Sequence, residues 1–341
     1  METNPQHTPR YSVIVPVYNR NDEVADLLDS LRAQSRRDLF EIIIVEDGSP
    51  LPCTDAIRDH GEGLDLTYIQ NENEGRSIAR NHGIARARGE WLVFFDSDVV
   101  VPPDYFATLD QQLAENPDTD CFGGPDAAHE SFTATQKAIN FAMTSFLTTG
   151  GIRGGKHSLE KFTPRSFNMG YRRKVWETVG GFREMFSEDI DMSMRIRQGG
   201  FNTRLIRDAA VYHKRRVDFR KFLRQVYVFG MSRITLKLLY PGSLKAVHAL
   251  PAVAVVLGVL CVLLAILFSP WWLLPIGIYL IAIFIAALAS TRSLKIAALA
   301  VPASVIQIGG YGCGFIRAWV SKILLGEGRD INQEIMMRKG K

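Results

Sequence analysis

The N-terminal part of the chain alternates short apolar runs with segments that repeat apolar residues at helical spacing. The predicted strands are residues 11–17, 41–45, 66–70 and 91–95, and the predicted helices between them are residues 22–34, 54–60 and 75–88. Strands that alternate with helices form a mostly parallel sheet with helices on both faces. We therefore predict an α/β domain whose ligands lie at the carboxyl ends of its strands.

The C-terminal part holds long apolar stretches that are almost free of charge. They cover residues 249–268, 271–290 and 296–320. About 20 residues, at a rise of about 1.5 Å each, cross the hydrocarbon core of a bilayer. The first two stretches are therefore predicted as transmembrane helices, and Ser269 and Pro270 form a turn between them.

The third stretch is interrupted by polar and small residues. It contains Gln307, Gly309, Gly310, Gly312, Gly314 and Arg317. These residues leave the number of spans at two or three, and the length of the stretch favours three.

Composition and charge favour a cytoplasmic domain attached to a membrane. A hydrophobic content of 47% is too high for an ordinary soluble domain and too low for a polytopic transporter. The first ten residues lack the apolar run of a signal peptide. Arg292 and Lys295, between the second and third stretches, fall inside by the positive-inside rule. The tail is also basic, which conflicts with three full spans.

We accordingly divide the chain into four parts. They are a cytoplasmic domain at 1–213, a basic juxtamembrane segment at 214–247, the membrane region at 248–320 and a polar basic tail at 321–341. The basic segment is interpreted as facing anionic cytoplasmic lipid, so a membrane is the expected partner and no nucleic acid is expected. The four cysteines show no CxxC spacing, which argues against a disulfide framework or a zinc site.

Two carboxylates follow the strand predicted at 91–95. Asp96 and Asp98 flank Ser97 in the sequence FFDSD. Carboxylate oxygens suit hard divalent cations such as Mg²⁺ or Mn²⁺, and a cation held there can neutralise a diphosphate as it leaves. Aspartates also end strands as simple turn formers, so the pair alone leaves both interpretations open.

Four segments together carry a more specific pattern. They are VIVPVYN at 13–19, IIIVEDGS at 42–49, NEGRSIARNHGIARARGEWLVFFDSD at 73–98 and NMGYRRKVWETVGGFREMFSEDIDMSMRIRQGGF at 168–201. In this order and spacing they closely resemble the family 2 glycosyltransferases, which are inverting enzymes with the nucleotide-diphosphosugar-binding fold called glycosyltransferase A. The resemblance covers nearly all of residues 11–213 and implies a hexosyltransferase.

The resemblance implies a donor site for a nucleotide-diphosphosugar. In it Pro16, Tyr18 and Asp47 would line the base of the nucleotide, with the carboxylate of Asp47 accepting a hydrogen bond from a ring N–H. That contact suits uracil or thymine, so a UDP-sugar is favoured. Gly75 and Arg80 would lie beside the diphosphate.

The resemblance also implies the metal ligands and the base. Asp96 would meet the ribose or a metal-bound water, Asp98 would hold Mn²⁺ or Mg²⁺, and His213 would complete the ligand set. Glu188 and Asp189 match the Glu-Asp pair at the start of a helix. An inverting transfer needs a carboxylate that removes the acceptor proton, and we expect Asp189 to be that base.

The acceptor and the alternatives stay open. The chain lacks the Gln-x-x-Arg-Trp sequence of chain-polymerising relatives, so we expect one sugar per encounter. The acceptor is a lipid-linked saccharide, a polyprenyl phosphate or a glycolipid, in cell-envelope glycan or glycolipid synthesis. A nucleotidyltransferase would carry a glycine-rich loop after the first strand, where this chain has PVYNR. A non-catalytic membrane scaffold would have been favoured by loss of Asp98 or Asp189, and both are present.

Overall fold

The computed structural model describes residues 8–127, 132–150, 162–213 and 218–327. The chain divides into two compact units. The first consists of Met1–His129 and Phe162–Lys214, and the second of Glu130–Lys161 and Arg215–Lys341.

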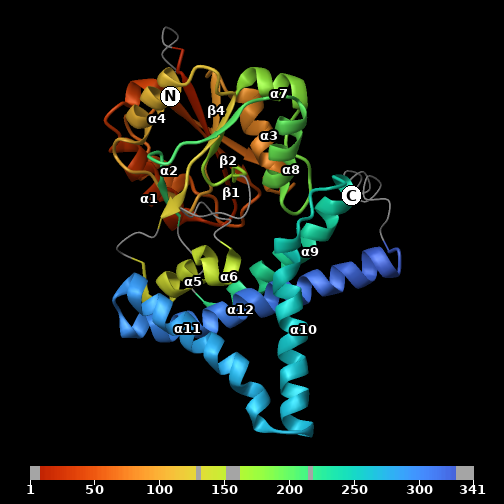
Figure 1. Cartoon of the computed structure of the whole chain (residues 1–341). Helices are drawn as coiled ribbons and strands as arrows, with labels where there is room; N and C mark the ends of the chain where they lie inside the picture. Colours follow the sequence, from red (N-terminus) through yellow and green to blue (C-terminus); the bar gives the residue numbers. More distant parts are fainter. Residues whose placement is uncertain (1–7, 128–131, 151–161, 214–217, 328–341) are drawn as a thin grey trace. The chain divides into compact units, whose positions relative to one another are not determined.

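The first unit is built on a seven-stranded sheet with the order β3-β2-β1-β4-β8-β6-β9 (Figure 1). Its parallel part consists of β1 (Tyr11–Val17), β2 (Phe40–Asp47), β3 (Leu66–Asn71) and β4 (Trp91–Phe94). β8 (Met169–Arg172) pairs antiparallel with both β4 and β6 (Cys121–Gly123), and β9 (Thr203–Leu205) pairs parallel with β6. The mostly parallel α/β sheet predicted from the sequence is confirmed.

Helices cover both faces of this sheet, as Figure 1 shows. On one face lie α1 (Asn21–Arg32), α2 (Thr54–His60) and α4 (Tyr105–Glu115), and on the other lie α3 (Arg76–Arg86), α7 (Arg173–Val179) and α8 (Glu188–Gln198). Successive strand residues point to opposite faces. Val13 and Val15 therefore pack in the first core and Ile14 in the second, which explains why β1 is mostly apolar.

A second, three-stranded sheet has the order β5-β10-β7. It consists of β5 (Val99–Val100), β7 (Asp126–Ala127) and β10 (Val211–His213). The antiparallel register of β10 on β5 sets His213 opposite Val99. The end of the first unit is thereby brought beside the segment that follows Asp98.

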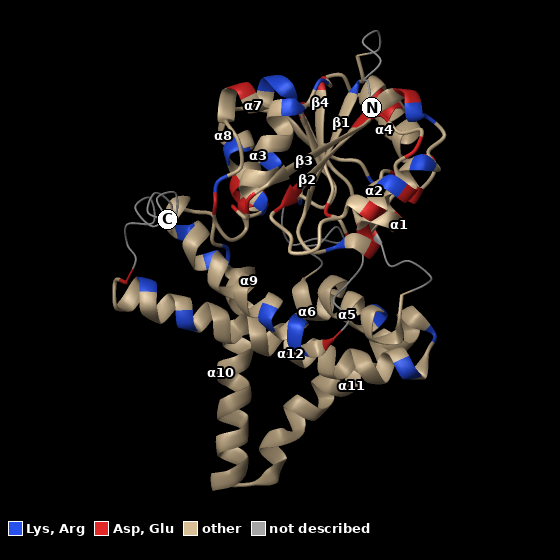
Figure 2. Ribbon diagram, turned by 180° about the vertical axis from the view of Figure 1, so that it is seen from behind, with Lys and Arg blue, Asp and Glu red and all other residues tan. Residues whose placement is uncertain are grey.

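The second unit is helical. Its elements are α5 (Ala134–Thr144), α6 (Phe146–Thr149), α9 (Phe219–Leu239), α10 (Ala246–Leu267), the 3₁₀ turn η2 (Pro270–Leu273), α11 (Leu274–Thr291) and α12 (Leu294–Ala318), which continues into a π-helical turn, η3 (Trp319–Leu324). Within the described residues, three helices are long and apolar enough to cross a membrane: Ala246–Leu267, Pro270–Thr291 and Leu294–Leu324. Figure 2 shows that charged residues are scarce along the first two.

Residues 132–150 pack with the second unit. The reason is the two apolar sides of α5. Ala138 and Phe141 pack with residues of α11 and α12, and Ile139 and Ala142 pack with residues of α9 and α12. A short helix of mixed composition gives no sign from its own sequence of which distant helices it covers.

Gly310, Gly312 and Gly314 of α12 are packing positions and not interruptions of the helix. A Cβ at Gly314 would overlap the backbone oxygen of Tyr227 in α9, and a Cβ at Gly230 of α9 would overlap the backbone oxygen of Tyr311 in α12. Gly310 and Gly314 are four residues apart, the small-xxx-small spacing that lets two helix backbones approach closely. These residues let α9 and α12 pack backbone to backbone.

We expect Gly314→Ala to destabilise the helical unit and Gly309→Ala to leave it unchanged or slightly stabilised. A Cβ at Gly309 meets nothing within 4 Å, so alanine there gains helix propensity of about 0.5–1 kcal/mol. At Gly314 the same methyl pushes α9 and α12 apart, at a cost of about 1–3 kcal/mol. Thermal unfolding of the full chain in detergent compares the two variants, and equal melting temperatures would contradict the packing.

Candidate active site

Polar residues gather where β1, β2 and β4 end. β1 pairs in parallel with both β2 and β4, so the carboxyl ends of the three strands lie at one edge of the sheet. Asp47 is the last residue of β2, Tyr18 follows β1, and Asp96 and Asp98 follow β4. This edge is where open α/β sheets bind their ligands, as expected from the sequence.

Asp47 joins the end of β2 to the start of α3. Its Oδ1 accepts hydrogen bonds from the backbone N–H groups of Glu74 at 2.8 Å and Gly75 at 3.1 Å, and its Oδ2 accepts from Gly75 at 3.0 Å. Burial raises the pKa of Asp47 against these hydrogen bonds, which act to lower it. Gly75 has a φ of +92°, a backbone conformation that favours glycine. Asp47 and Gly75 are thus brought together, and the contact of Asp47 with a nucleotide ring stays a prediction.

Glu46 organises the loop beside Tyr18. Glu46 is fully buried; its carboxylate accepts hydrogen bonds from the Ser49 hydroxyl and, at 2.8 Å, from the Cys53 backbone N–H. The Ser49 Oγ in turn accepts from the Asn19 backbone N–H at 2.6 Å. The side chain of Tyr18 is 50% exposed and Pro16 is partly buried, so both remain accessible to a ligand at this edge.

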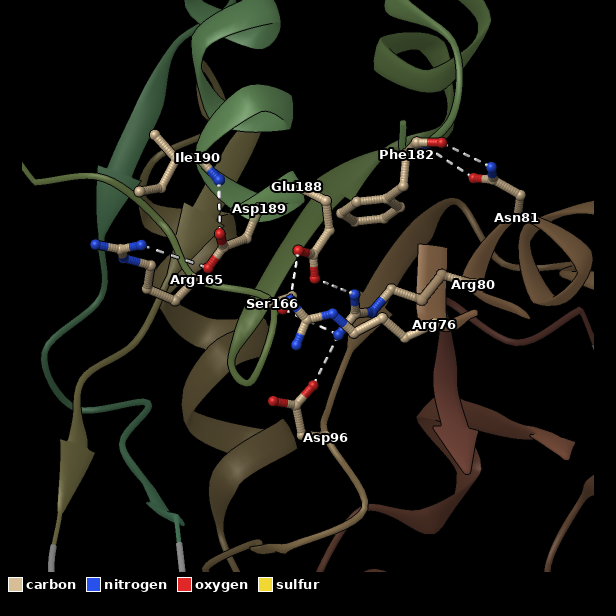
Figure 3. A network of polar contacts seen from close by, with 10 residues as sticks. All are labelled: Arg76, Arg80, Asn81, Asp96, Arg165, Ser166, Phe182, Glu188, Asp189 and Ile190. Atoms are coloured by element: carbon tan, nitrogen blue, oxygen red, sulfur yellow. Dashed lines mark hydrogen bonds and ion pairs between the residues drawn. The ribbon is translucent and has the colours of Figure 1, made fainter. Parts of the chain in front are cut away.

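Arg80 is the centre of a buried polar network (Figure 3). Its guanidinium donates to Glu188 Oε1 at 2.9 Å, to Asp96 Oδ1 at 2.8 Å and to Ser166 Oγ at 3.0 Å. It also lies 5.3 Å from the centre of the Phe182 ring. One side chain therefore links α3, the loop after β4 and the start of α8.

Arg80 is 1% exposed and points into this network, and its place beside the diphosphate stays a prediction. It lies on the same face of α3 as the buried Gly83 and Ile84, three and four residues later. Arg76, one turn earlier on α3, has a side chain that is 59% exposed and contacts Glu188 at 2.7 Å. Sequence reasoning missed Arg76.

Glu188 and Asp189 are adjacent in sequence but differ in environment. Glu188 is 2% exposed, and its two oxygens accept from Arg80 and Arg76. Asp189 is 17% exposed; its Oδ1 accepts from the Ile190 backbone N–H at 2.8 Å, and its Oδ2 lies 3.5 Å from Arg165. Glu188 is therefore committed to the arginine network, and Asp189 is the more accessible carboxylate of the pair.

The charges around Asp189 keep it ionised. Burial acts to raise the pKa of Asp189, but the positive charges of Arg165 and Arg76 and the Ile190 N–H outweigh it, so the pKa lies below its usual range. Ser187, just before the pair, has a φ of +62°, which is uncommon for a residue with a side chain. This conformation starts α8 so that Glu188 and Asp189 fall in its first turn, where the helix dipole also favours negative charge.

The acidic residues after β4 are the ones expected to hold a cation. The Asp96 side chain is 34% exposed and Asp98 is partly buried. The side chain of His213 lies outside the described residues, although the backbone of His213 is paired with Val99, next to Asp98. Among the described residues, no group of three or more His, Cys, Asp or Glu residues is placed to hold a metal ion. The two carboxylates nevertheless fit a hard cation whose other ligands are water and diphosphate oxygens.

The mostly parallel sheet, the helices on both of its faces and the polar residues at the carboxyl ends of its strands match the glycosyltransferase A fold. Residues 12–180 match the family model described as Glycosyl transferase family 2. The chain therefore carries a family 2 glycosyltransferase domain, followed by three apolar helices.

Similar proteins agree with this assignment. The chain is 42% identical over 100 residues to the putative glycosyltransferase EpsH of Bacillus subtilis, a match that covers 29% of this chain and 28% of that protein. It is 30% identical over 188 residues to the uncharacterized glycosyltransferase EpsJ of the same organism, covering 53% of this chain and 52% of that one. The chain thus spans about half or less of the length of these curated relatives.

One solved structure resembles most of the chain. The mannosyltransferase PcManGT from Pyrobaculum calidifontis, in complex with GDP-Man and Mn²⁺, superposes with a TM-score of 0.56 and 20% sequence identity, covering 95% of this chain and 90% of that one. At this identity the likeness establishes the fold alone.

Proposed function

We propose that the chain is a membrane-bound, metal-dependent, inverting glycosyltransferase. It moves a single sugar from a nucleotide-diphosphosugar to a lipid or lipid-linked acceptor in cell-envelope glycan or glycolipid synthesis. The observation that carries the proposal is the Arg80 network, because one buried guanidinium connects Asp96, at the donor edge of the sheet, to the Glu188-Asp189 turn. A donor site and a basic carboxylate in one rigid network are what a direct displacement requires.

In this reaction the carboxylate of Asp189 removes the proton of the acceptor hydroxyl. The hydroxyl oxygen then bonds to the anomeric carbon as the bond from that carbon to the diphosphate oxygen breaks on the opposite face, which inverts the configuration. The lowered pKa of Asp189 keeps it ionised before the acceptor arrives. Asp98 and Asp96 would hold Mn²⁺ or Mg²⁺, which neutralises the charge of the leaving diphosphate.

The proposed donor rests on residues at the edge of the sheet, and the proposed acceptor rests on the apolar helices. Asp47 ends β2 and the exposed Tyr18 follows the neighbouring strand β1, and we propose that they line the base of a UDP-sugar donor. PcManGT holds GDP-Man, so guanine is the main competitor. The apolar helices α10 and α11 support a lipid acceptor and attachment to the cytoplasmic face of the cell (inner) membrane. A polyprenyl phosphate is the alternative acceptor.

A donor screen tests the function. The purified full chain is incubated with UDP-, GDP- and dTDP-sugars and Mn²⁺, and release of the nucleoside diphosphate is measured. The positive donor is then supplied radiolabelled to membranes, with and without polyprenyl phosphate, and label is followed into the lipid fraction. Release from a UDP-sugar with labelled lipid would support the proposal. Release of no nucleoside diphosphate from any donor would reject glycosyl transfer from nucleotide-diphosphosugars.

Metal dependence gives a further expected result. EDTA should abolish transfer, and Mn²⁺ or Mg²⁺ should restore it, because the leaving diphosphate needs a cation. Asp98→Asn should weaken donor binding as well as turnover, since it removes a ligand oxygen charge. Asp59→Asn is the matched control, because the Asp59 side chain is 55% exposed in the last turn of α2. Calorimetry with a nucleoside diphosphate and Mn²⁺ measures binding, and full activity in excess chelator would refute the dependence.

A further inference from the structure

We propose that α12 lies in the plane of the membrane surface, so that the chain crosses the bilayer only through α10 and α11. The tail after α12 would then stay on the side of the membrane from which α10 enters, together with the domain that precedes α10. This inference rests on the membrane attachment proposed above. It concerns the third apolar helix, whose length and composition alone allow it to span.

The direction of α12 is the first argument. Within the second unit α10 runs lengthwise to the turn η2, α11 returns obliquely from it, and α12 runs across the hairpin (Figure 1). The opposite view in Figure 2 shows the same crosswise course. α10 has 22 residues, or about 33 Å at about 1.5 Å per residue, which matches the hydrocarbon core. When α10 stands across the bilayer, a helix that runs crosswise to it lies along the surface.

The packing of α12 is the second argument. In the most apolar segment of the helix that contains α12, 39% of the residues are buried inside the structure, against 6% for α10 and 11% for the helix that contains α11. α12 is covered by α9, through Gly310 and Gly314, and by α5, through Ala300 and Ala303. α5 has only 11 residues and is too short to cross a bilayer. α12 thus belongs to a packed layer with α5 and α9, whereas α10 and α11 expose most of their surface.

The charge distribution is the third argument. The turn between α10 and α11 carries no charged residue, and Trp271 and Trp272 there are 77% and 47% exposed. Basic residues flank α12 at both ends, with Lys295 in its first turn and Arg317 and Lys322 at its end. A spanning α12 would carry Arg317 and Lys322 to the side of the uncharged turn. An in-plane α12 keeps both ends on the positive side, and the conflict between the basic tail and three spans disappears.

The exposed side of α12 fits an anionic lipid surface. It is one stripe at spacings of three to eight residues, formed by Lys295, Ala298, Pro302, Val305, Cys313 and Arg317. The middle of this stripe is apolar or small and both ends are cationic. An in-plane helix of this kind sits at the boundary between headgroups and acyl chains, where its cations reach lipid phosphates.

Reporter proteins distinguish two spans from three. Alkaline phosphatase, which is active only after export, and a fluorescent protein, which folds in the cytoplasm, are fused after Lys341 of the full chain and, separately, inserted after Ser269. We expect fluorescence from the C-terminal fusion and phosphatase activity only from the insertion. Phosphatase activity from the C-terminal fusion would overturn the inference. An inactive phosphatase at Ser269 would instead reject membrane spanning by α10 and α11, which the inference requires.

Depth measurements test the in-plane orientation itself. Spin labels are placed singly on the exposed stripe of α12. Labels at Ala298 and Val305 use a Cys261→Ala/Cys313→Ala variant, and the label at Cys313 uses Cys261→Ala; the remaining Cys53 and Cys121 are buried. Oxygen and a nickel chelate report the depth of each label in liposomes that contain phosphatidylglycerol. We expect similar shallow depths at the three positions. A maximum at Val305, near the middle of α12, would show a spanning helix and overturn the inference.

The matched control uses the exposed residues of α10. Labels at Leu250, Leu257 and Leu267 should be shallow, deep and shallow in turn, because α10 crosses the core. A crossing profile on α10 together with equal depths on α12 supports the inference. Equal depths on both helices would show that the whole unit lies on the surface, and the inference would fail.

Discussion

Replacing Asp189 with asparagine is expected to lower the transfer rate by about 10²- to 10⁴-fold, the usual contribution of a general base. The barrier would rise by roughly 3–5 kcal/mol. Asparagine keeps nearly the same shape and can still accept from the Ile190 N–H, so the turn that begins α8 should hold. Donor affinity should therefore change by no more than a few fold. Single-turnover transfer rates and calorimetry with Mn²⁺ present measure the two quantities separately.

Glu188→Gln is the comparison for this variant. Glu188 is held by Arg76 and Arg80 and is buried, so it is badly placed to meet an acceptor hydroxyl. Its replacement should act on stability and on donor binding through Asp96, and less on the chemical step. If Asp189→Asn retained more than about a tenth of the parent rate, Asp189 would not be the base, and Glu188 would be the first candidate.

The pH dependence of the rate examines the same assignment. A base with a lowered pKa stays ionised as the pH falls, so the acid loss of activity should occur below the ordinary range of an aspartate. Arg165→Gln removes a positive charge 3.5 Å from Asp189 and should move that acid limb to higher pH. If Arg165→Gln did not shift the acid limb of the pH–rate profile, a group other than Asp189 would control that limb.

The sequence predicts most of the sheet because β1, β2 and β4 are buried on both faces. β1 and β2 are runs of mostly apolar residues bounded by turn formers, so the ends of both strands can be located from the sequence. β6 and β9 have three residues each, too few for a period of two to show. Their places in the sheet depend on pairing with β8 and with each other, which local sequence does not encode.

The site was predicted as a set of positions and not as a geometry. The motifs put Asp96 and Asp98 after a strand and Glu188 and Asp189 at a helix start, and the structure has them there. The sequence did not show which arginine of α3 is buried, because that depends on how the helix is turned against the sheet. It also gave no sign that Asp47 binds the backbone of Glu74 and Gly75, since those hydrogen bonds join distant segments.

The buried pair of Arg80 and Glu188 should dominate the stability of the enzyme domain. Their side chains are 1% and 2% exposed, so Arg80→Met leaves a buried carboxylate with Arg76 as its remaining cation. Breaking a buried ion pair from one side typically costs about 3–5 kcal/mol. For a domain of this size the melting temperature should fall by on the order of 10 °C. Asp96 also loses a partner, but it is 34% exposed and water can replace the arginine.

Two further variants decide whether the charge pair is the cause. Arg76→Met removes the other cation of Glu188, but its side chain is 59% exposed, so the melting temperature should fall much less. The double variant Arg80→Met/Glu188→Met removes both buried charges and should recover a large part of the loss, since a buried pair replaced by apolar residues is often close to neutral. If the losses of the single variants simply added in the double variant, the two buried charges would not be coupled. An Arg80→Met loss no greater than that of Arg76→Met would show that the network contributes little to the stability of the fold.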